Sequence, residues 1–546
     1  MCVIERFNVN LLFVKTTMYK KVFLVVIIVF VALGCAKRGY ITGGEKDEFP
    51  PQVLKTSPEN FSTHFNSQEI TILFDEYVKL KDVSKQLIIS PPMKNKPEIT
   101  PFSASKFIKI RLRDTLQPNT TYSLNFGQSI EDNNEGNKLQ GYRYVFSTGS
   151  YIDSLSINGY VKDALDKETE KFVSVMLYEI NETFTDSVIY KENPRYITNT
   201  LDSVAFSLEN LKEGNYLLVA LKDKNNNNRF DPKQDKMAFY SQTISVPTDE
   251  DFSLEMFSEI PDFKPVRAFE TSKNKLTFAH EGKAENTKIE LRNGNQLLET
   301  IITKVKDKDS LNIWYKPIEV DSLGLKIFKD TITKDFVVKL KEKKSDTLSL
   351  SMKSSKRLSF RENVIYESTT PLISFDKSKF ELMTKDSLAV DFETKYDEWT
   401  QKFELIFEKE EKQKYLFTMY PNAVTDFFGK ANDTITTDFS TSNYSDYGNL
   451  RITLQNVREF PIIVQLTDDK GKILAEQYSE ESSIIEFFYL NPNMYNLRII
   501  YDSNQNKIWD TGNYLKKIQP EKVIYFPDKI DVRANWDVEQ PFILKE

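Results

Sequence analysis

The sequence predicts an all-β protein, built as a tandem array of about five β-sandwiches. Short segments that alternate apolar and polar residues recur along the chain, as in "EITILFDEYVKL", "YRYVFSTG" and "FELIFEKE". β-Branched and aromatic residues are frequent in these segments, and Asn, Asp, Gly and Pro turns separate them. No long segment has the period of a helix. Since one sandwich takes roughly a hundred residues, the chain of 546 residues is long enough for about five.

The amino-terminal segment is predicted to be a targeting signal rather than part of the fold. The basic "MYKK" from Met18 precedes "VFLVVIIVFVALG", an apolar run too short to span a bilayer comfortably. The run ends at Gly34-Cys35, which resembles the lipobox of bacterial lipoproteins, with Ala32 where Leu is usual. This resemblance implies cleavage before Cys35, acylation of Cys35 and, since no Asp follows, anchoring in the outer membrane. An ordinary secretory signal or a single membrane anchor is the alternative.

We therefore expect residues 1–34 to be a signal peptide with its true start at Met18, and residues 35–47 to be a lipidated linker. Whether the protein faces the periplasm or the cell surface stays open. With Cys2 removed, Cys35 is the single remaining cysteine, so burial alone must hold the fold. The net charge of −7 and the scattered basic residues argue against nucleic acid as a partner.

The segment after the linker contains a Pro-Pro-x-Val strand, an "FDEYV" strand, an "LQPNTTY" turn, a "DNNEGN" hairpin and a closing "FST" strand. In this order the motifs resemble the SbsA-type bacterial Ig-like domain, over residues 48–149. That family packs its first strand beside the second. The matching residues are Pro50, Pro51, Val53, Phe74, Glu76, Val78, Leu116, Pro118, Thr120, Tyr122, Asp132, Asn137, Phe146 and Thr148. The preceding "CAKRGYITGGEKDEFPP" looks like the start of lipoproteins from Bacteroidota.

Two later segments, residues 150–255 and 444–546, share one pattern. "INGYVKDA" followed by "FSLENLKEGNYLLVALKD" resembles the carboxypeptidase regulatory-like or Cna-B-like sandwich, a prealbumin-like fold whose name implies no catalytic residues. The last segment repeats the pattern without a gap. The aligned pairs are Leu211 with Leu490, Tyr216 with Tyr495 and Asp223 with Asp502. Residues 256–355 and 356–443 are expected to form two further sandwiches.

No catalytic constellation is present in the sequence, and we expect no enzyme. The two histidines, His64 and His280, have no spaced His or Cys partner. Neither a Gly-x-Ser-x-Gly elbow nor a phosphate-binding Gly-rich loop occurs. Carboxylate pairs such as Asp75-Glu76 are expected as solvated faces in a chain with 80 acidic residues.

Two stretches, "YLLVALKDKNNNNRFD" and "YNLRIIYDSNQNKIWD", end in similar Asp-Asn loops that we interpret as weak structural Ca²⁺ sites. The oxygens fall at positions 1, 3, 5, 7 and 9 of an EF-hand-like loop, where position 7 lends a backbone carbonyl. The candidate ligands are Asp223, Asn225, Asn227, Arg229, Asp231 and Asp235 in the first loop, and Asp502, Asn504, Asn506, Ile508 and Asp510 in the second. The alternative is a polar turn whose amides bond their own backbone.

A tripeptide of Asp, Ser or Thr, and an aliphatic residue recurs and resembles the O-glycosylation sequon of Bacteroidota envelope proteins. The candidate sites are Thr115, Ser154, Ser187, Ser203, Ser310, Ser322, Thr331, Thr347, Ser387 and Thr434. The alternative is a turn that precedes an aliphatic strand.

Two classes of function remain after this reading. The first is a non-catalytic, lipid-anchored envelope protein, a scaffold or accessory subunit of outer-membrane protein machinery such as that for barrel or lipoprotein biogenesis. The second is a ligand-binding surface lipoprotein for glycans or an adhesion target. Aromatics on exposed strand faces, such as Trp314, Tyr315 or Trp399, would favour it, whereas aromatic residues in sandwiches more often lie in the core.

Overall fold

The computed structural model describes residues 46–545, and the expected signal peptide and Cys35 lie outside them. Strands β1 to β43 make up nearly all the regular structure of this part of the chain. The prediction of an all-β array of tandem sandwiches is confirmed. No helix in residues 46–545 has the length and apolar character needed to cross a membrane.

The first group of strands, module 1, forms a six-stranded sheet packed on a three-stranded one. Its elements are β1 (Val53–Ser57), β2 (Glu69–Leu80), α2 (Val83–Gln86), β3 (Ile88–Ser90), β4 (Glu98–Thr100), β5 (Ser105–Arg111), β6 (Thr121–Asn125), β7 (Ile130–Asp132), β8 (Lys138–Leu139) and β9 (Arg143–Ser147). Val53 pairs with Phe74, so the first strand lies beside the second as the family resemblance implies. Tyr122, Leu124 and Phe126 face one core, as the alternation along this strand predicts.

Modules 2 and 5 share one topology, a three-stranded sheet with one parallel pair packed on a five-stranded sheet. Module 2 consists of β10 (Leu155–Asp163), β11 (Ser174–Glu179), α3 (Val188–Lys191), β12 (Tyr196–Asn199), β13 (Ala205–Leu211), β14 (Gly214–Lys222), β15 (Lys236–Phe239), β16 (Ile244–Val246) and β17 (Asp251–Met256). Module 5 consists of η2 (Tyr444–Asp446), β36 (Gly448–Gln455), β37 (Ile462–Thr467), β38 (Ile473–Ser479), β39 (Ile484–Leu490), β40 (Asn493–Tyr501), β41 (Val523–Tyr525), β42 (Ile530–Val532) and β43 (Asp537–Ile543).

The aligned tyrosines of these two modules play the same part. Each phenol donates a hydrogen bond to the backbone carbonyl four residues earlier, Tyr216 to Lys212 at 3.0 Å and Tyr495 to Asn491 at 2.7 Å.

Modules 3 and 4 are sandwiches of two four-stranded sheets, and module 4 carries an additional strand pair. Module 3 consists of β18 (Lys264–Ser272), β19 (Lys275–Glu281), β20 (Lys288–Asn293), β21 (Gln296–Leu297), β22 (Thr300–Lys304), β23 (Ser310–Tyr315), β24 (Ser322–Lys329) and β25 (Ile332–Lys339). Module 4 consists of β26 (Leu350–Met352), β27 (Arg357–Leu358), β28 (Val364–Ser368), β29 (Leu372–Phe375), η1 (Lys377–Lys379), β30 (Phe380–Thr384), β31 (Phe392–Asp397), β32 (Lys402–Phe407), β33 (Lys414–Met419), β34 (Val424–Asp426) and β35 (Ile435–Thr441).

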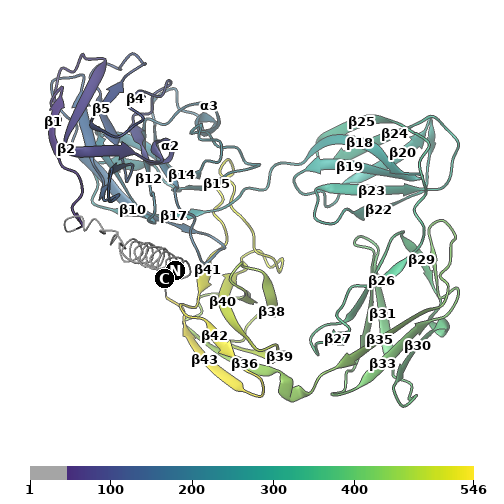
Figure 1. Cartoon of the computed structure of the whole chain (residues 1–546). Helices are drawn as coiled ribbons and strands as arrows, with labels where there is room; N and C mark the ends of the chain where they lie inside the picture. The colour runs from purple at the N-terminus through teal and green to yellow at the C-terminus, as the bar shows by residue number, and fades with distance from the viewer. Residues whose placement is uncertain (1–45, 546) are drawn as a thin grey trace, which may run out of the picture.

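The modules do not form an open row, because the chain curves back until module 5 lies beside module 2 (Figure 1). Polar contacts join each neighbouring pair along the curve, such as Lys304 N–H to the Trp399 carbonyl between modules 3 and 4. Direct hydrogen bonds between modules 5 and 2 close the circuit. We call modules 2 to 5 joined in this way the closed ring.

Strand β14 is apolar on both of its faces, so the outer sheet face of module 2 must be covered by other modules. Tyr216, Leu218 and Ala220 point into the core of the sandwich, whereas Leu217 and Val219 belong to a second apolar cluster on the opposite face of the sheet. A strand buried on both faces has a continuous apolar sequence rather than an alternating one. This second cluster is completed by Ile88 from module 1 and by Trp509 and Tyr514 from module 5.

Candidate functional site

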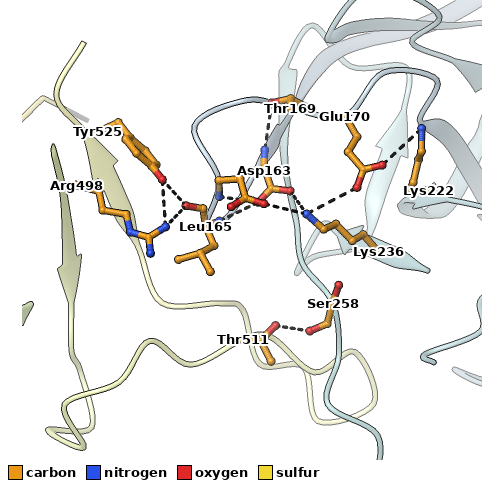
Figure 2. Close-up of polar contacts among 11 residues, drawn as sticks. Asp163, Leu165, Thr169, Glu170, Lys222, Lys236, Ser258, Arg498, Thr511 and Tyr525 are labelled. Atoms are coloured by element: carbon orange, nitrogen blue, oxygen red, sulfur yellow. Dashed lines mark hydrogen bonds and ion pairs between the residues drawn. The ribbon is translucent and has the colours of Figure 1, made fainter. Parts of the chain in front are cut away.

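Modules 2 and 5 are distant in sequence, and hydrogen bonds join them directly. At the centre of this contact the backbone carbonyl of Leu165 accepts two hydrogen bonds from module 5, from Arg498 Nη1 at 3.0 Å and from the Tyr525 hydroxyl at 2.8 Å (Figure 2). Arg498 is 3 % exposed, and its Nε donates to Gln465 Oε1 at 2.6 Å. The buried guanidinium is therefore satisfied largely by neutral oxygens, one of them from module 2.

Asp163 fixes the turn that presents the Leu165 carbonyl. Its carboxylate accepts the backbone N–H groups of Leu165 at 3.0 Å and Asp166 at 2.8 Å. The same carboxylate pairs with Lys236 Nζ at 2.7 Å, as Figure 2 shows. Burial alone would lower the pKa of Lys236, but the hydrogen bond and the charge of Asp163 outweigh burial and raise it. The turn is thus anchored to module 2 before it meets module 5.

A second contact is made by the segment after β40, which leaves module 5 and docks on the outer sheet face of module 2. The Tyr514 side chain is fully buried there, with its ring 5.4 Å from that of Phe239 in an edge-on arrangement. Its backbone N–H donates to Glu259, and Thr511 Oγ1 donates to the Ser258 carbonyl at 2.7 Å. Burial raises the pKa of both Tyr514 and Glu259. This second contact is largely apolar because of the Tyr514 ring, whereas the first contact, at Leu165, consists of hydrogen bonds.

The two Asp-Asn loops adopt one geometry. At position 1, Asp223 accepts the N–H of Asn228 at 2.6 Å, and Asp502 accepts the N–H of Lys507 at 2.8 Å. At position 5, the Asn227 side chain accepts the Arg229 N–H at 2.9 Å, as that of Asn506 does for Ile508. Positions 4 and 6 have left-handed backbone in both loops, at Asn226, Asn228, Gln505 and Lys507.

Each loop also has a second carboxylate that holds both of its ends. In the first loop Asp235 accepts the N–H groups of Lys224 and Asp231, at 3.0 and 2.9 Å. In the second loop Glu521 does the same for Ser503 and Asp510, at 2.9 and 3.0 Å. Asp235 is a residue that the sequence pattern selects, but Glu521 is missed because it stands eleven residues after Asp510 (521 − 510). Its equivalence is visible only once the segment has folded back.

These carboxylates mainly receive backbone N–H groups. The Asp510 carboxylate also accepts the side-chain amides of Asn504 at 2.6 Å and Asn506 at 2.5 Å. Within residues 46–545, no three His, Cys, Asp or Glu side chains gather as metal ligands do. Calcium binding by the loops stays a prediction.

The histidines and tryptophans take structural positions. His64 lies exposed in a left-handed turn, and the His280 ring is within 3.0 Å of the Gly282 carbonyl oxygen. Trp314 and Tyr315 are buried, each 1 % exposed, so they belong to the core and offer no surface to a glycan. They pack into module 3 because Trp314 Nε1 finds Thr303 Oγ1 at 2.9 Å inside the sandwich. Trp399 is 38 % exposed.

The candidate O-glycosylation residues are mostly at the surface. Thr115, Ser154, Ser203, Ser322, Thr331, Thr347, Ser387 and Thr434 are exposed, and Ser187 and Ser310 are half-buried. Accessibility permits modification of the eight exposed residues without deciding between a glycan and a turn, so the sites stay predictions.

The comparisons with known proteins bear on module 1. Residues 47–148 match the bacterial Ig-like domain family. This match covers the segment in which the sequence motifs resemble such a domain, and that part of the family resemblance is confirmed. No curated protein matches the chain.

Solved multidomain structures also resemble the chain, though only loosely. The S-layer protein SbsC is 11 % identical with a TM-score of 0.15, the alignment covering 88 % of this chain and 67 % of that one. A tandem of titin domains is 8 % identical with a TM-score of 0.15, over 44 % of this chain and 90 % of the other. The α2-macroglobulin of Salmonella is 9 % identical with a TM-score of 0.14, and the alignment covers 85 % of this chain and 44 % of that one. Superposition at this level carries no functional argument.

Proposed function

We propose that the protein is a non-catalytic scaffold of the bacterial cell envelope, anchored by lipid at Cys35 in the outer membrane. It presents the surfaces of its sandwiches to envelope or outer-membrane proteins as an accessory subunit of their machinery. The observation that carries the proposal is the closed ring, in which the buried Arg498 and Tyr514 hold two sequence-distant modules together. A frame that fixes its modules in this way lowers the entropy lost when a partner binds several of them at once.

The carboxylates at the ring closure make structural contacts. The buried carboxylates at the ring closure, Asp163 and Glu259, are engaged by a lysine or by backbone N–H groups. None of them is paired with a nucleophile or a histidine, as acid–base or covalent catalysis needs. The site therefore fits a structural role.

Co-purification with cross-linking from detergent-solubilised membranes tests the proposal. Wild-type protein should capture an outer-membrane protein in a stoichiometric amount, and a variant with an opened ring should capture less of it. Arg498→Met combined with Tyr525→Phe removes both donors to the Leu165 carbonyl and serves as that variant. Equal capture by the two proteins would show that the closed ring does not organise the partner surface.

A second candidate function is glycan binding, which is favoured by a cluster of three aromatic rings at the junction of modules 4 and 5. The rings of Phe360, Tyr444 and Tyr489 lie 4.6 to 5.2 Å from one another. Tyr444 and Tyr489 are 42 % and 36 % exposed. Aromatic faces of this kind can stack on sugar rings, and a glycan array with a Tyr444→Ser, Tyr489→Ser control tests this alternative. Binding that the double variant retains would exclude these rings as the glycan site.

A further inference from the structure

A cleft of about 900 Å³ lies at the seam between modules 1 and 2, away from the ring closure. It is bordered by β3 of module 1 and by β12 of module 2, where the Ile197 N–H donates to Ser90 Oγ at 3.1 Å. The volume is in the range of sites that take a small organic ligand. The cleft opens to solvent at Phe102, whose side chain is 90 % exposed.

The two walls of the cleft differ in chemistry. Module 1 supplies an aliphatic wall, in which Val83, Leu87, Ile89 and Met93 line the cleft and also pack against the module 1 core. It also supplies the basic residues Lys85 and Lys96 at the rim of this wall. Module 2 supplies a mostly polar wall, with Ser174, Thr198, Asn199, Asn226 and Asn228. A ligand that fills the cleft must therefore have an apolar part and a polar part.

The charged residues of the rim are mostly cationic, although the chain as a whole has a net charge of −7. Four lining residues are basic, Lys85, Lys96, Arg113 and Lys222, and two are acidic, Glu98 and Asp223. Arg113 is paired with Glu98 at 2.9 Å, and Lys222 with Glu170 at 3.6 Å. Lys85 and Lys96 make no ion pair with any residue in the described range.

We propose that this cleft binds a single-chain fatty acid. The acyl chain lies along the aliphatic wall of module 1, where Ile89 and Met93 bury it, and the carboxylate lies near Lys85 and Lys96. Burial of the chain provides the larger part of the binding free energy because each methylene is removed from water. The two lysines that lack partners complement the carboxylate and select an anionic head group.

A peptide strand fits the cleft less well than a fatty acid. An extended peptide binds by pairing its backbone with a free sheet edge. The edge strands that border the cleft are short, with three residues in β3, three in β4 and four in β12, and β3 lies against β12. None of them offers a long free edge, and an acyl chain needs none.

The test uses the chain from Lys46 onward, which contains every strand and core described above. Fluorescence of 11-(dansylamino)undecanoic acid should rise on binding at a stoichiometry of one, and palmitate should displace the probe. Lys85→Glu combined with Lys96→Glu should weaken the binding of palmitate roughly tenfold or more, because two attractive charges become repulsive. Met93→Asp should remove binding by placing a charge in the aliphatic wall.

Lys94→Glu is the matched control, since Lys94 is exposed on the same loop but does not line the cleft. It should bind like wild type, and the melting temperatures of all variants verify that they are folded. The proposal is overturned if palmitate does not displace the probe, or if the folded lysine double variant binds as tightly as the control. Equal affinity for palmitate and its methyl ester would rule out selection of the anionic head. Competition by an acidic, apolar peptide as strong as that by palmitate would reassign the cleft to a peptide.

Discussion

Arg498 of the last module donates a hydrogen bond of 3.0 Å to the backbone carbonyl of Leu165, which precedes it by more than three hundred residues. Arg498 reaches the Leu165 turn from a polar part of the outer sheet face of module 5. Gln465, Asn496 and Arg498 are all buried on that face. A buried cation must keep its hydrogen bonds, so the pair specifies how the modules meet.

Removing both donors to the Leu165 carbonyl should loosen the ring. In Arg498→Met, Tyr525→Phe, that carbonyl is left without its partners from module 5. A lost hydrogen bond to a charged donor costs roughly 1.5–3 kcal/mol, which shifts the closing equilibrium at least tenfold. Amide hydrogen exchange in residues 163–170 should rise accordingly. Arg451→Met, on an exposed ion pair of the same module, should leave exchange in 163–170 unchanged.

Tyr514 should anchor the docked segment independently of Arg498. Truncation in Tyr514→Ala removes a fully buried ring from the apolar cluster on module 2, at a cost of about 3–5 kcal/mol to docking. Hydrogen exchange should rise in residues 511–519 and stay slow in β37 and β40. Leu515→Ala is the control because Leu515 is 56 % exposed. Slow exchange in residues 511–519 of Tyr514→Ala would contradict an anchoring role.

The sequence reveals the strands of this protein better than their arrangement. Alternation in "EITILFDEYVKL" predicts β2, and the repeated Asp-x-Asn pattern marks two loops that share their hydrogen bonds. The ring closure was not predicted, because Arg498 and Leu165 carry no local pattern that links them. Two signals for it exist: the unbroken apolar run of β14, and an arginine inside the apolar strand β40. Each signal indicates that a sheet face is covered by another part of the chain, but neither signal identifies the covering segment.

Asp132 should make module 1 sensitive to acid. Its carboxylate accepts four backbone N–H groups, those of residues 134 to 137, at 2.6 to 3.1 Å. Burial acts in the opposite direction, but these hydrogen bonds outweigh it and lower the pKa of Asp132. Because the pKa of Asp132 is lower in the folded than in the unfolded protein, its ionised carboxylate stabilises the fold at pH values above the unfolded pKa of about 3.9. This stabilisation is lost as the pH falls through the folded pKa.

Hydrogen exchange in residues 130–139 measures this effect. In wild type, the protection at neutral pH should decrease below about pH 4 after correction for intrinsic rates. Asp132→Asn should lower protection at neutral pH by about 1–3 kcal/mol and flatten the pH dependence. A variant that keeps the wild-type pH profile would show that another group titrates.

Lipid attachment at Cys35 is a separate prediction from the sequence. The basic stretch, the apolar run and Gly34-Cys35 imply acylation of that cysteine. Metabolic labelling with an alkyne fatty acid should tag the wild-type chain and leave Cys35→Ala unlabelled. Cys2→Ala serves as the control and should be labelled like wild type, since cleavage removes residue 2. Labelling of Cys35→Ala at the wild-type level would refute the lipoprotein assignment.

The two Asp-Asn loops should respond to calcium together. Each combines a position 1 Asp with a second carboxylate, Asp223 with Asp235 and Asp502 with Glu521, so both hold hard oxygens in a left-handed turn. Backbone N–H groups already occupy much of this oxygen surface, and calcium must compete with them. The affinity should therefore be weak, on the order of 10⁻⁴ to 10⁻³ M.

Calcium at 5 mM should then stabilise each loop by about 1–2 kcal/mol relative to chelator, because it binds the folded loop alone. Exchange of the amides in residues 223–235 and 502–521 should slow by that amount. Asp223→Asn with Asp231→Asn should remove the response of the first loop and leave the second as an internal control. Magnesium at the same concentration should have a smaller effect, since it demands a stricter octahedral geometry. If calcium changes amide exchange in neither loop, Asp223 and Asp502 act only as hydrogen-bond acceptors for backbone N–H groups of their loops. The Asp-Asn pattern then encodes a turn that occurs in both modules and not a metal site.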